Sequence, residues 1–183
     1  MAEALTDEVL QHARRGEPDA LATVYRSLAG QVLGYLEAKG VDDAEGATQD
    51  VFLTVFSRIG DMEGGVSGLR SFTFSVAHAR MVDATRARAR APWVDEYSPE
   101  EDPRRSPSPQ DEVMDRLGSG ELAAVLDGLL PDQRECVLLR IVAGLSIEET
   151  AAALGKSAGA VKQLQRRGLL AMKKALEGAE VHV

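Results

Sequence analysis

A segment rich in proline and acidic residues divides the chain and limits what either side of it can fold into. The stretch "APWVDEYSPEEDPRRSPSPQDE" begins at Ala91 and holds five of the seven prolines. Residues 91–117 carry eight Asp and Glu against three Lys and Arg. Because such a composition cannot bury a core, it predicts an extended acidic linker over 91–117. We therefore expect one domain at 1–90 and a second at 118–183.

The overall composition is typical of small folded domains. Of the 183 residues, 44% are hydrophobic, which excludes a disordered chain, and no apolar run approaches the roughly 18 residues of a membrane span. The first residues, "MAEALTDEVL", lack the basic and apolar blocks of a signal peptide. The single Cys136 excludes an internal disulfide and a CxxC metal site. These features predict a cytoplasmic protein without membrane insertion.

Helical spacing of apolar residues runs through the first domain. Thr6 is placed to cap a short helix, Pro18 suits the first turn of a second, and Asp42 or Asp43 is placed to cap a third. "GDMEGGVSG" is predicted to be a glycine-rich loop, after which Ser71 caps a last helix that extends to residue 90. No stretch alternates with a period of two, so the fold class predicted is all-α.

The second domain carries the start and stop signals of two short helices in succession. Pro131 begins one helix, and Ser146 with Glu149 has the spacing of a capping box that begins the next. Gly155 tolerates the left-handed turn that ends that helix, and Ser157 can cap the last one. Two short helices joined through "LGKS" predict a helix-turn-helix.

The residue types around this turn favour DNA binding. Ala151 is small, as a close helix crossing requires, and Val161 packs the second helix on the first. The outward face of the second helix then holds side chains suited to base edges and phosphates, with Ser157 at its start: Lys162, Gln163, Arg166 and Arg167. The alternative is an ordinary helical hairpin with a solvated basic face.

The net charge of the chain limits how tightly it can bind DNA by itself. The chain carries −8, which opposes tight independent binding to a polyanion, although residues 156–174 contain six Lys and Arg and no acid. Both observations are satisfied if a larger partner carries the protein to nucleic acid.

A second informative segment is 61–90. Phe72 and Phe74 follow the glycine-rich loop and precede a basic helix that contains Arg80, Arg86, Arg88 and Arg90. Aromatic rings beside arginines suit unpaired bases, which stack on the rings while the arginines hold phosphates. The alternative is that the phenylalanines are core residues and the arginines a solvated helix end.

Three motifs in order resemble the extracytoplasmic-function (ECF) group of bacterial RNA polymerase sigma factors. "DAEGATQDVFLTVFSRI" resembles the polymerase-binding helix of the family, and "LRSFTFSVAHARMVDATRARAR" resembles its promoter-melting segment. "LPDQRECVLLRIVAGLSIEETAAALGKSAGAVKQLQRRGLLAMKKAL" resembles its region four. The resemblance covers nearly the whole chain, including the acidic linker.

The resemblance implies a role for each motif. Core RNA polymerase would be bound through Asp43, Glu45, Thr48, Gln49, Asp50 and Phe52. The minus-ten promoter element would be bound through Ser67, Arg70, Ser71, Phe72, Arg80, Arg86, Arg88 and Arg90. The minus-thirty-five element would be bound through Ser157, Lys162, Gln163, Arg166 and Arg167. An anti-sigma protein is a further partner that is common in the family.

The sequence departs from the family pattern at several of these positions. Gly46 stands where the family often has an acid, which weakens the helix locally by about 1 kcal/mol. Phe72 stands for the commoner Trp, and Gln165 stands for a usual core Leu, whose packing Leu164 can take over. These departures put single contacts in question and leave the segment assignments in place.

Two other classes of function are alternatives to a sigma factor. A stand-alone helix-turn-helix regulator would explain 118–183 but gives no role to the motifs before the linker. An enzyme would need clustered chemistry, yet His12, His78 and His182 are scattered and neither HExxH nor a phosphate-binding loop is present. We therefore expect no catalytic residue, no metal, no cofactor and no small-molecule substrate. Cys136 is expected to be a buried small hydrophobe.

Overall fold

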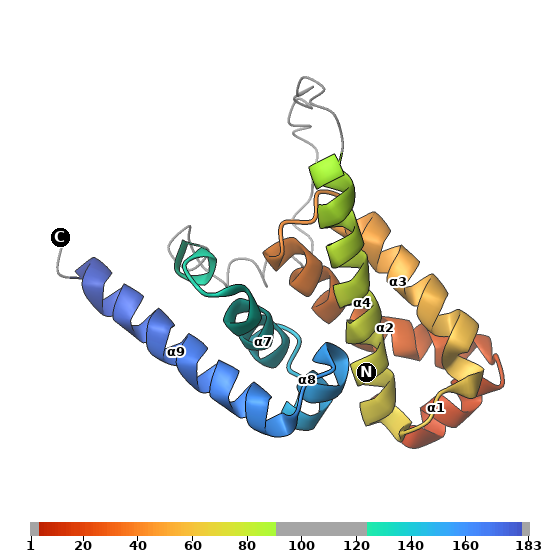
Figure 1. Cartoon of the computed structure of the whole chain (residues 1–183). Coiled ribbons are helices and arrows are strands. Elements are labelled where there is room, and N and C mark those ends of the chain that lie inside the picture. The colour runs from red at the N-terminus through yellow and green to blue at the C-terminus, as the bar shows by residue number, and fades with distance from the viewer. Residues whose placement is uncertain (1–3, 91–123, 181–183) are drawn as a thin grey trace.

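The computed structural model describes residues 4–90 and 124–180, and every regular element in these residues is helical. Figure 1 shows two groups of helices. The first comprises α1 (Asp7–Arg14), α2 (Pro18–Ala38), α3 (Ala44–Arg58), a single 3₁₀ turn η1 (Ile59–Asp61) and α4 (Gly65–Arg90). The second comprises α7 (Pro131–Ile141), α8 (Ile147–Leu154) and α9 (Ala158–Glu180), and residues 124–127 are also helical. The all-α prediction is confirmed, and the linker expected at 91–117 lies outside the described residues.

Local capping explains where the helices of the first group begin. The Thr6 hydroxyl accepts from the Val9 amide at 3.3 Å, and Pro18 is the first residue of α2. Of the two candidate caps for α3, Asp43 is the one used, since its carboxylate accepts from the Gly46 amide at 2.9 Å. Each of these starts follows from side chains within four residues of the helix end, as predicted.

The start of α4 differs from the prediction. The glycine-rich segment was expected to be a loop up to Ser71, but the helix begins six residues earlier, at Gly65. Its first turn is capped from a distance, because the Asp7 carboxylate on α1 accepts from the Val66 amide at 2.8 Å. Ser71 lies inside the helix and donates to the Ser67 carbonyl at 3.0 Å, so its predicted role as a cap was wrong.

The helix-turn-helix forms where its local signals predict. Ser146 and Glu149 make a complete capping box at the start of α8, and Gly155 ends α8 in the left-handed conformation with φ 61°. The Ser157 hydroxyl accepts from the Ala160 amide at 3.2 Å in the first turn of α9. A residue with a Cβ would be strained at that φ, which is why glycine occupies the turn.

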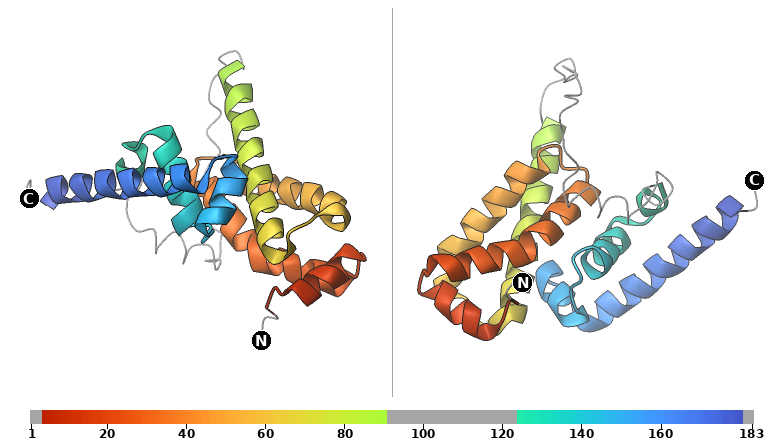
Figure 2. Two further views of the ribbon diagram at one scale, coloured as in Figure 1. Left: turned by 60° about the horizontal axis from the view of Figure 1, so that its bottom comes forward. Right: turned by 180° about the vertical axis from the view of Figure 1, so that it is seen from behind.

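The two groups of helices share one hydrophobic core. Tyr35 and Phe74 meet edge to face at the centre of the first group, with ring centroids 5.9 Å apart. The same cluster of buried side chains continues into Leu138, Leu139 and Leu145 of the second group. Figures 1 and 2 show α8 lying against α4, and α2 contacts α7 in the same way. This packing between the two groups of helices was not predicted from the sequence.

Candidate nucleic-acid interface

A basic face on α9 is presented to solvent. Five side chains at the start and along one side of α9 are exposed: Ser157, Lys162, Gln163, Arg166 and Arg167. None of the three cations among them forms an ion pair within the described part of the chain, whereas Lys156, just before α9, pairs with Asp132 at 2.9 Å. The predicted minus-thirty-five residues therefore lie together on one helix. Their donors remain available to phosphates and base edges.

Small buried side chains fix α9 on the helices before it. Cys136, Ala151 and Val161 form a compact cluster under the turn, with Leu164 packed at its edge. Burial raises the pKa of the Cys136 thiol, in keeping with its predicted role as a small hydrophobe. Gln165 leaves the core and accepts from the Arg140 guanidinium at 3.2 Å. Leu164 thus takes over the packing at the position where the sequence departs from the family.

A pocket of about 380 Å³ opens beside the start of α4. Its wall is made by residues from the end of α3, the loop and α4: Arg58, Asp61, Met62, Glu63, Gly68 and Phe72. The loop approaches α4 so closely that a Cβ at Gly68 would lie 2.2 Å from the Glu63 carbonyl oxygen. Arg14 of α1 holds the loop from outside by donating to the Met62 carbonyl at 2.5 Å. The half-buried Phe72 therefore offers a ring at the rim of a preformed, partly polar cavity.

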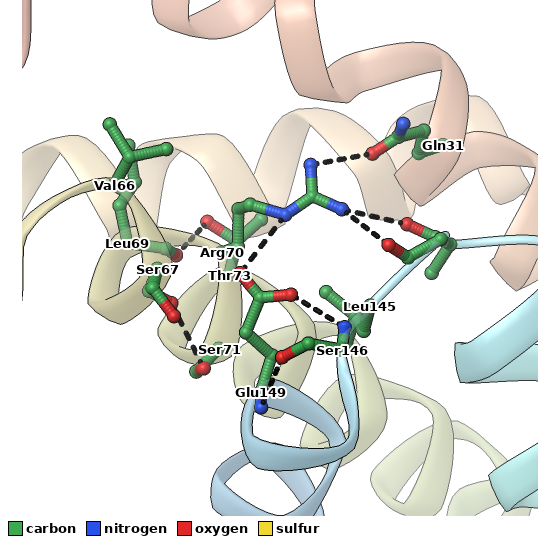
Figure 3. A network of polar contacts seen from close by, with 12 residues as sticks. Gln31, Val66, Ser67, Leu69, Arg70, Ser71, Thr73, Leu145, Ser146 and Glu149 are labelled. Atoms are coloured by element: carbon green, nitrogen blue, oxygen red, sulfur yellow. Dashed lines mark hydrogen bonds and ion pairs between the residues drawn. The ribbon is translucent and has the colours of Figure 1, made fainter. Parts of the chain in front are cut away.

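Arg70 lies on the opposite side of α4 from this pocket. Figure 3 shows its guanidinium directed toward Gln31 and toward the backbone that precedes α8. It donates to the Gln31 amide oxygen at 3.4 Å and to the carbonyls of Ala143 and Gly144 at 3.1 Å each. It also pairs with the Glu149 carboxylate at 3.4 Å. The structure does not bring Arg70 together with Phe72, because residues two apart on a helix face different sides.

The other predicted minus-ten residues are distributed along α4. Ser67 and Ser71 are neighbours on its first turns, joined by the hydrogen bond described above. Arg80 is exposed and pairs with Asp50 of α3 at 3.5 Å, which ties α4 to the helix beside it. The positions of Arg86, Arg88 and Arg90 fall on α4, and their side chains lie outside the described residues.

The predicted polymerase-binding residues of α3 divide into two sets. Thr48 and Phe52 are buried, and Phe52 meets Tyr25 edge to face at 4.8 Å, so both support the helix from inside. The acidic and amide members are exposed: Asp43, Glu45, Gln49 and Asp50. Leu53 was not predicted, yet its side chain is 68% exposed one turn beyond Gln49. The sequence signal that could have identified Leu53 was an apolar residue on the otherwise polar face of this helix.

A buried carboxylate was also missed. Glu135, an acid near the positive end of α7, was not predicted to contact another helix, but the residue is 5% exposed and its carboxylate reaches the first group of helices. It accepts from the Tyr35 hydroxyl and from Lys39 at 2.5 Å, and lies 3.1 Å from His78 Nδ1. Its partners are 57 to 100 residues earlier in the chain, so no local pattern marks them.

Two other kinds of site are absent from the residues that the structure describes. Among the described residues, no group of three or more His, Cys, Asp and Glu is placed to hold a metal ion. Within the same part of the chain, no helix is long and apolar enough to cross a membrane.

Comparison with known proteins gives a consistent result. A family model described as Sigma-70, region 4 matches residues 119–172. The ECF RNA polymerase sigma factor SigD of Mycobacterium tuberculosis is 30% identical over 176 residues, which cover 91% of this chain and 82% of SigD. The ECF RNA polymerase sigma factor BldN of Streptomyces coelicolor is 31% identical over 167 residues, covering 88% of this chain. The chain spans 62% of the length of BldN.

Solved structures share the fold. The structure of CnrH in complex with the cytosolic domain of CnrY matches with a TM-score of 0.70 at 20% identity, covering 96% of this chain and 99% of that one. The sigma factor RpoE from Bartonella quintana, in complex with the anti-sigma factor NepR, matches with a TM-score of 0.59 at 20% identity, covering 82% of this chain and 92% of that one. These matches agree with the sequence relatives, and it is those relatives that show that the chain belongs to the ECF group of RNA polymerase sigma factors.

Proposed function

We propose that this chain binds core RNA polymerase and directs it to promoters, where it contacts both promoter elements and assists strand opening. The observation that carries the proposal is the capped helix-turn-helix with its exposed basic face on α9. Arg and Gln side chains at this spacing can bind guanine and adenine edges in the major groove. Lys162, Gln163, Arg166 and Arg167 would contact the minus-thirty-five element.

The minus-ten element is assigned to the pocket beside α4. Phe72 at its rim provides a ring on which an unpaired base can stack, and Arg58 supplies a cation in the same wall. Ser67 and Ser71 lie on the first turns of the same helix. Arg70 could join them only after leaving its present partners, since all of its contacts lie toward α2 and α8.

Core polymerase is assigned to the exposed face of α3. Asp43, Glu45, Gln49 and Asp50 offer carboxylate and amide oxygens there, and Leu53 adds an apolar contact. A patch of this kind suits a protein partner, because an apolar side chain ringed by polar groups is typical of an interface. Thr48 and Phe52 would act through the packing of α3.

The remaining parts of the proposal concern partners and place of action. We propose a cytoplasmic factor with no catalysis of its own and no cofactor, acting on polymerase and promoter DNA. An anti-sigma protein is proposed as a regulator, supported by membership of a family in which RpoE was solved with the anti-sigma factor NepR. Neither an enzyme nor a small-molecule substrate is supported by any cluster of residues described above.

Transcription with purified components tests the proposed function. The chain and its cognate core polymerase should initiate at defined start sites, found by sequencing the transcripts. Arg166→Ala should lower initiation by roughly 5- to 150-fold, the equivalent of one base-edge contact of about 1–3 kcal/mol. Lys174→Ala, an exposed cation farther along α9, is the matched control and should have little effect. Specific duplex binding by the chain alone, without polymerase-dependent initiation, would favour the stand-alone regulator.

A further inference from the structure

An apolar groove lies within the basic face of α9. Three large apolar side chains in the second half of this helix are exposed: Leu169 at 42%, Leu170 at 51% and Leu176 at 43%. The first two line an open groove of about 460 Å³, whose other lining residues are Lys162, Gln165, Arg166 and Lys173. Adjacent exposed leucines in a groove with a polar rim are typical of a binding surface.

The packing of α9 explains why these leucines face outward. Val161 and Gly168 are buried on the inner side of the helix. A Cβ at Gly168 would lie 2.8 Å from Val137 Cγ2 of α7, so the two helices approach each other closely there. Since each residue of an α-helix advances by about 100°, Leu170 lies about 200° round from Gly168, on the opposite side of α9. Figures 1 and 2 show α7 and α8 on one side of α9, and Leu170 belongs to the other side.

Leu170 lies on the same side of α9 as the proposed minus-thirty-five residues. It follows Arg166 by four residues and Arg167 by three, which are the two spacings that bring side chains together on a helix face. Lys162 begins the same row, four residues before Arg166. Leu170 therefore extends by one turn the face that is proposed to enter the major groove.

The polar wall of the groove is fixed from inside the domain. Gln165 Oε1 accepts from Arg140 Nε at 3.2 Å, and the same guanidinium donates to the Leu145 carbonyl. Arg140 belongs to α7, Leu145 lies just before α8, and Gln165 belongs to α9. Because one side chain joins all three segments, the groove is a preformed surface.

Charge selects DNA as the occupant of this groove. Residues 156–174 contain six Lys and Arg and no acid, so cations border the exposed leucines. A groove with a cationic rim and an apolar centre fits a polyanion that carries an apolar group. The 5-methyl group of thymine is the apolar group that DNA presents among the base edges of the major groove.

We infer that Leu170 is a specificity-determining residue that contacts the 5-methyl group of a thymine in the minus-thirty-five element. Arg166 holds the neighbouring base edge, Lys162 holds the adjoining phosphate, and Leu169 forms the far wall of the groove. The inference deepens the proposed function and rests on it, because this groove meets a base edge only if α9 enters the major groove of a promoter.

The test removes the methyl group and the side chain separately. Promoters are located by sequencing the transcripts that the chain and core polymerase produce, and each thymine of the minus-thirty-five region is replaced in turn by deoxyuridine, which lacks only the methyl group. Initiation from each template is measured with the wild-type chain and with Leu170→Ala. Leu176→Ala is the matched control, because Leu176 is exposed to a similar extent and does not line the groove.

We expect the wild-type chain to initiate roughly fourfold less from one deoxyuridine template, which is the effect of leaving one methyl group in water. Leu170→Ala should initiate less than the wild type from the thymine template by a similar factor, and should lose nothing further on deoxyuridine. Leu176→Ala should retain the full difference between the two templates. Melting temperature and core-polymerase binding should be unchanged in both variants, since both side chains are exposed.

Three results would overturn the inference. One is a Leu170→Ala chain that remains as sensitive to the missing methyl group as the wild type. Another is a minus-thirty-five region in which no thymine responds to the replacement. The third is a loss of core-polymerase binding in Leu170→Ala, which would show that the groove holds a protein segment instead of DNA.

Failure of this inference can be told from failure of the proposed function. If Arg166→Ala lowers initiation but no deoxyuridine template does, only the thymine contact is wrong. If the chain does not initiate with core polymerase at all, the proposed function fails. Duplexes selected by the chain from a random pool are then compared with and without the methyl group in a mobility-shift assay. A methyl-dependent difference that Leu170→Ala abolishes would support the contact, and its absence would overturn it.

Discussion

Glu135 lies one turn into α7, a position where local sequence indicates only a favourable interaction with the helix dipole. Its side chain instead forms the polar centre of the contact with α2 and α4. Tyr35 shows the reciprocal effect, because burial and then the negative charge of Glu135 raise the pKa of its hydroxyl above the ordinary value. At this scale, one buried carboxylate raises the pKa of a neighbouring tyrosine and joins two groups of helices.

The first prediction concerns the response of this contact to acid. A carboxyl whose pKa falls from 4.5 to about 2 on folding stabilises the folded chain fully above pH 4.5. That stabilisation, on the order of 3 kcal/mol, is lost as the pH falls from 4.5 toward 2. The free energy of unfolding, measured by denaturant titration, should therefore drop over this range. Glu135→Gln should show a flatter profile, and an equal drop in both chains would contradict the prediction.

The second prediction concerns Phe72 at the rim of the α4 pocket. Phe72→Leu keeps an apolar side chain against the core, so stability should change by less than about 1.5 kcal/mol. Loss of the ring removes a stacking surface worth about 1–3 kcal/mol per base. Permanganate reactivity of promoter thymines should fall, and a template already mismatched across the minus-ten region should restore initiation in part.

Phe56→Leu is the control for this change, because Phe56 is also half-buried and lies on α3 away from the pocket. It should leave strand opening unchanged at a similar cost in stability. Equal opening by both variants, or a large drop in melting temperature for Phe72→Leu alone, would show that Phe72 serves only the core.

Among the elements, those that begin with local signals were the ones that the sequence predicted well. The capping box of Ser146 and Glu149, the left-handed Gly155 and the Pro18 start are each encoded within a few residues. The start of α4 was missed because its cap, Asp7, lies 59 residues earlier in the chain. Long-range contacts of this kind leave no periodic or motif signal, and the Arg70 and Glu135 contacts were missed for the same reason.

The third prediction tests the distant cap of α4. Asp7→Ala removes the acceptor of the Val66 amide, which should cost about 1 kcal/mol and fray the first turn of the helix. Hydrogen exchange of amides in residues 65–69 should accelerate relative to the rest of α4. Glu8→Ala changes a neighbouring acid in the first turn of α1 and should leave those amides protected. If hydrogen exchange were unchanged in Asp7→Ala, the first turn of α4 would be stable without the Asp7 cap.

At the scale of the whole molecule, the net charge opposes DNA binding by the free chain. The chain carries −8, and 91–117 alone contributes −5, with eight acids against three bases. The exposed cations of α9 are therefore set against a repulsive overall field.

The last prediction follows from this balance. The free chain should bind a promoter duplex and a scrambled duplex with similar, weak affinity in a mobility-shift assay, and both should weaken steeply with salt. Replacing the eight acids of 91–117 with Asn and Gln brings the net charge from −8 to zero and should strengthen both complexes equally. Preference for the promoter duplex over the scrambled duplex should therefore emerge only when core polymerase is present. If the linker variant alone strongly preferred the promoter duplex, the repulsive charge, and not the absence of polymerase, would be what limits specific binding by the free chain.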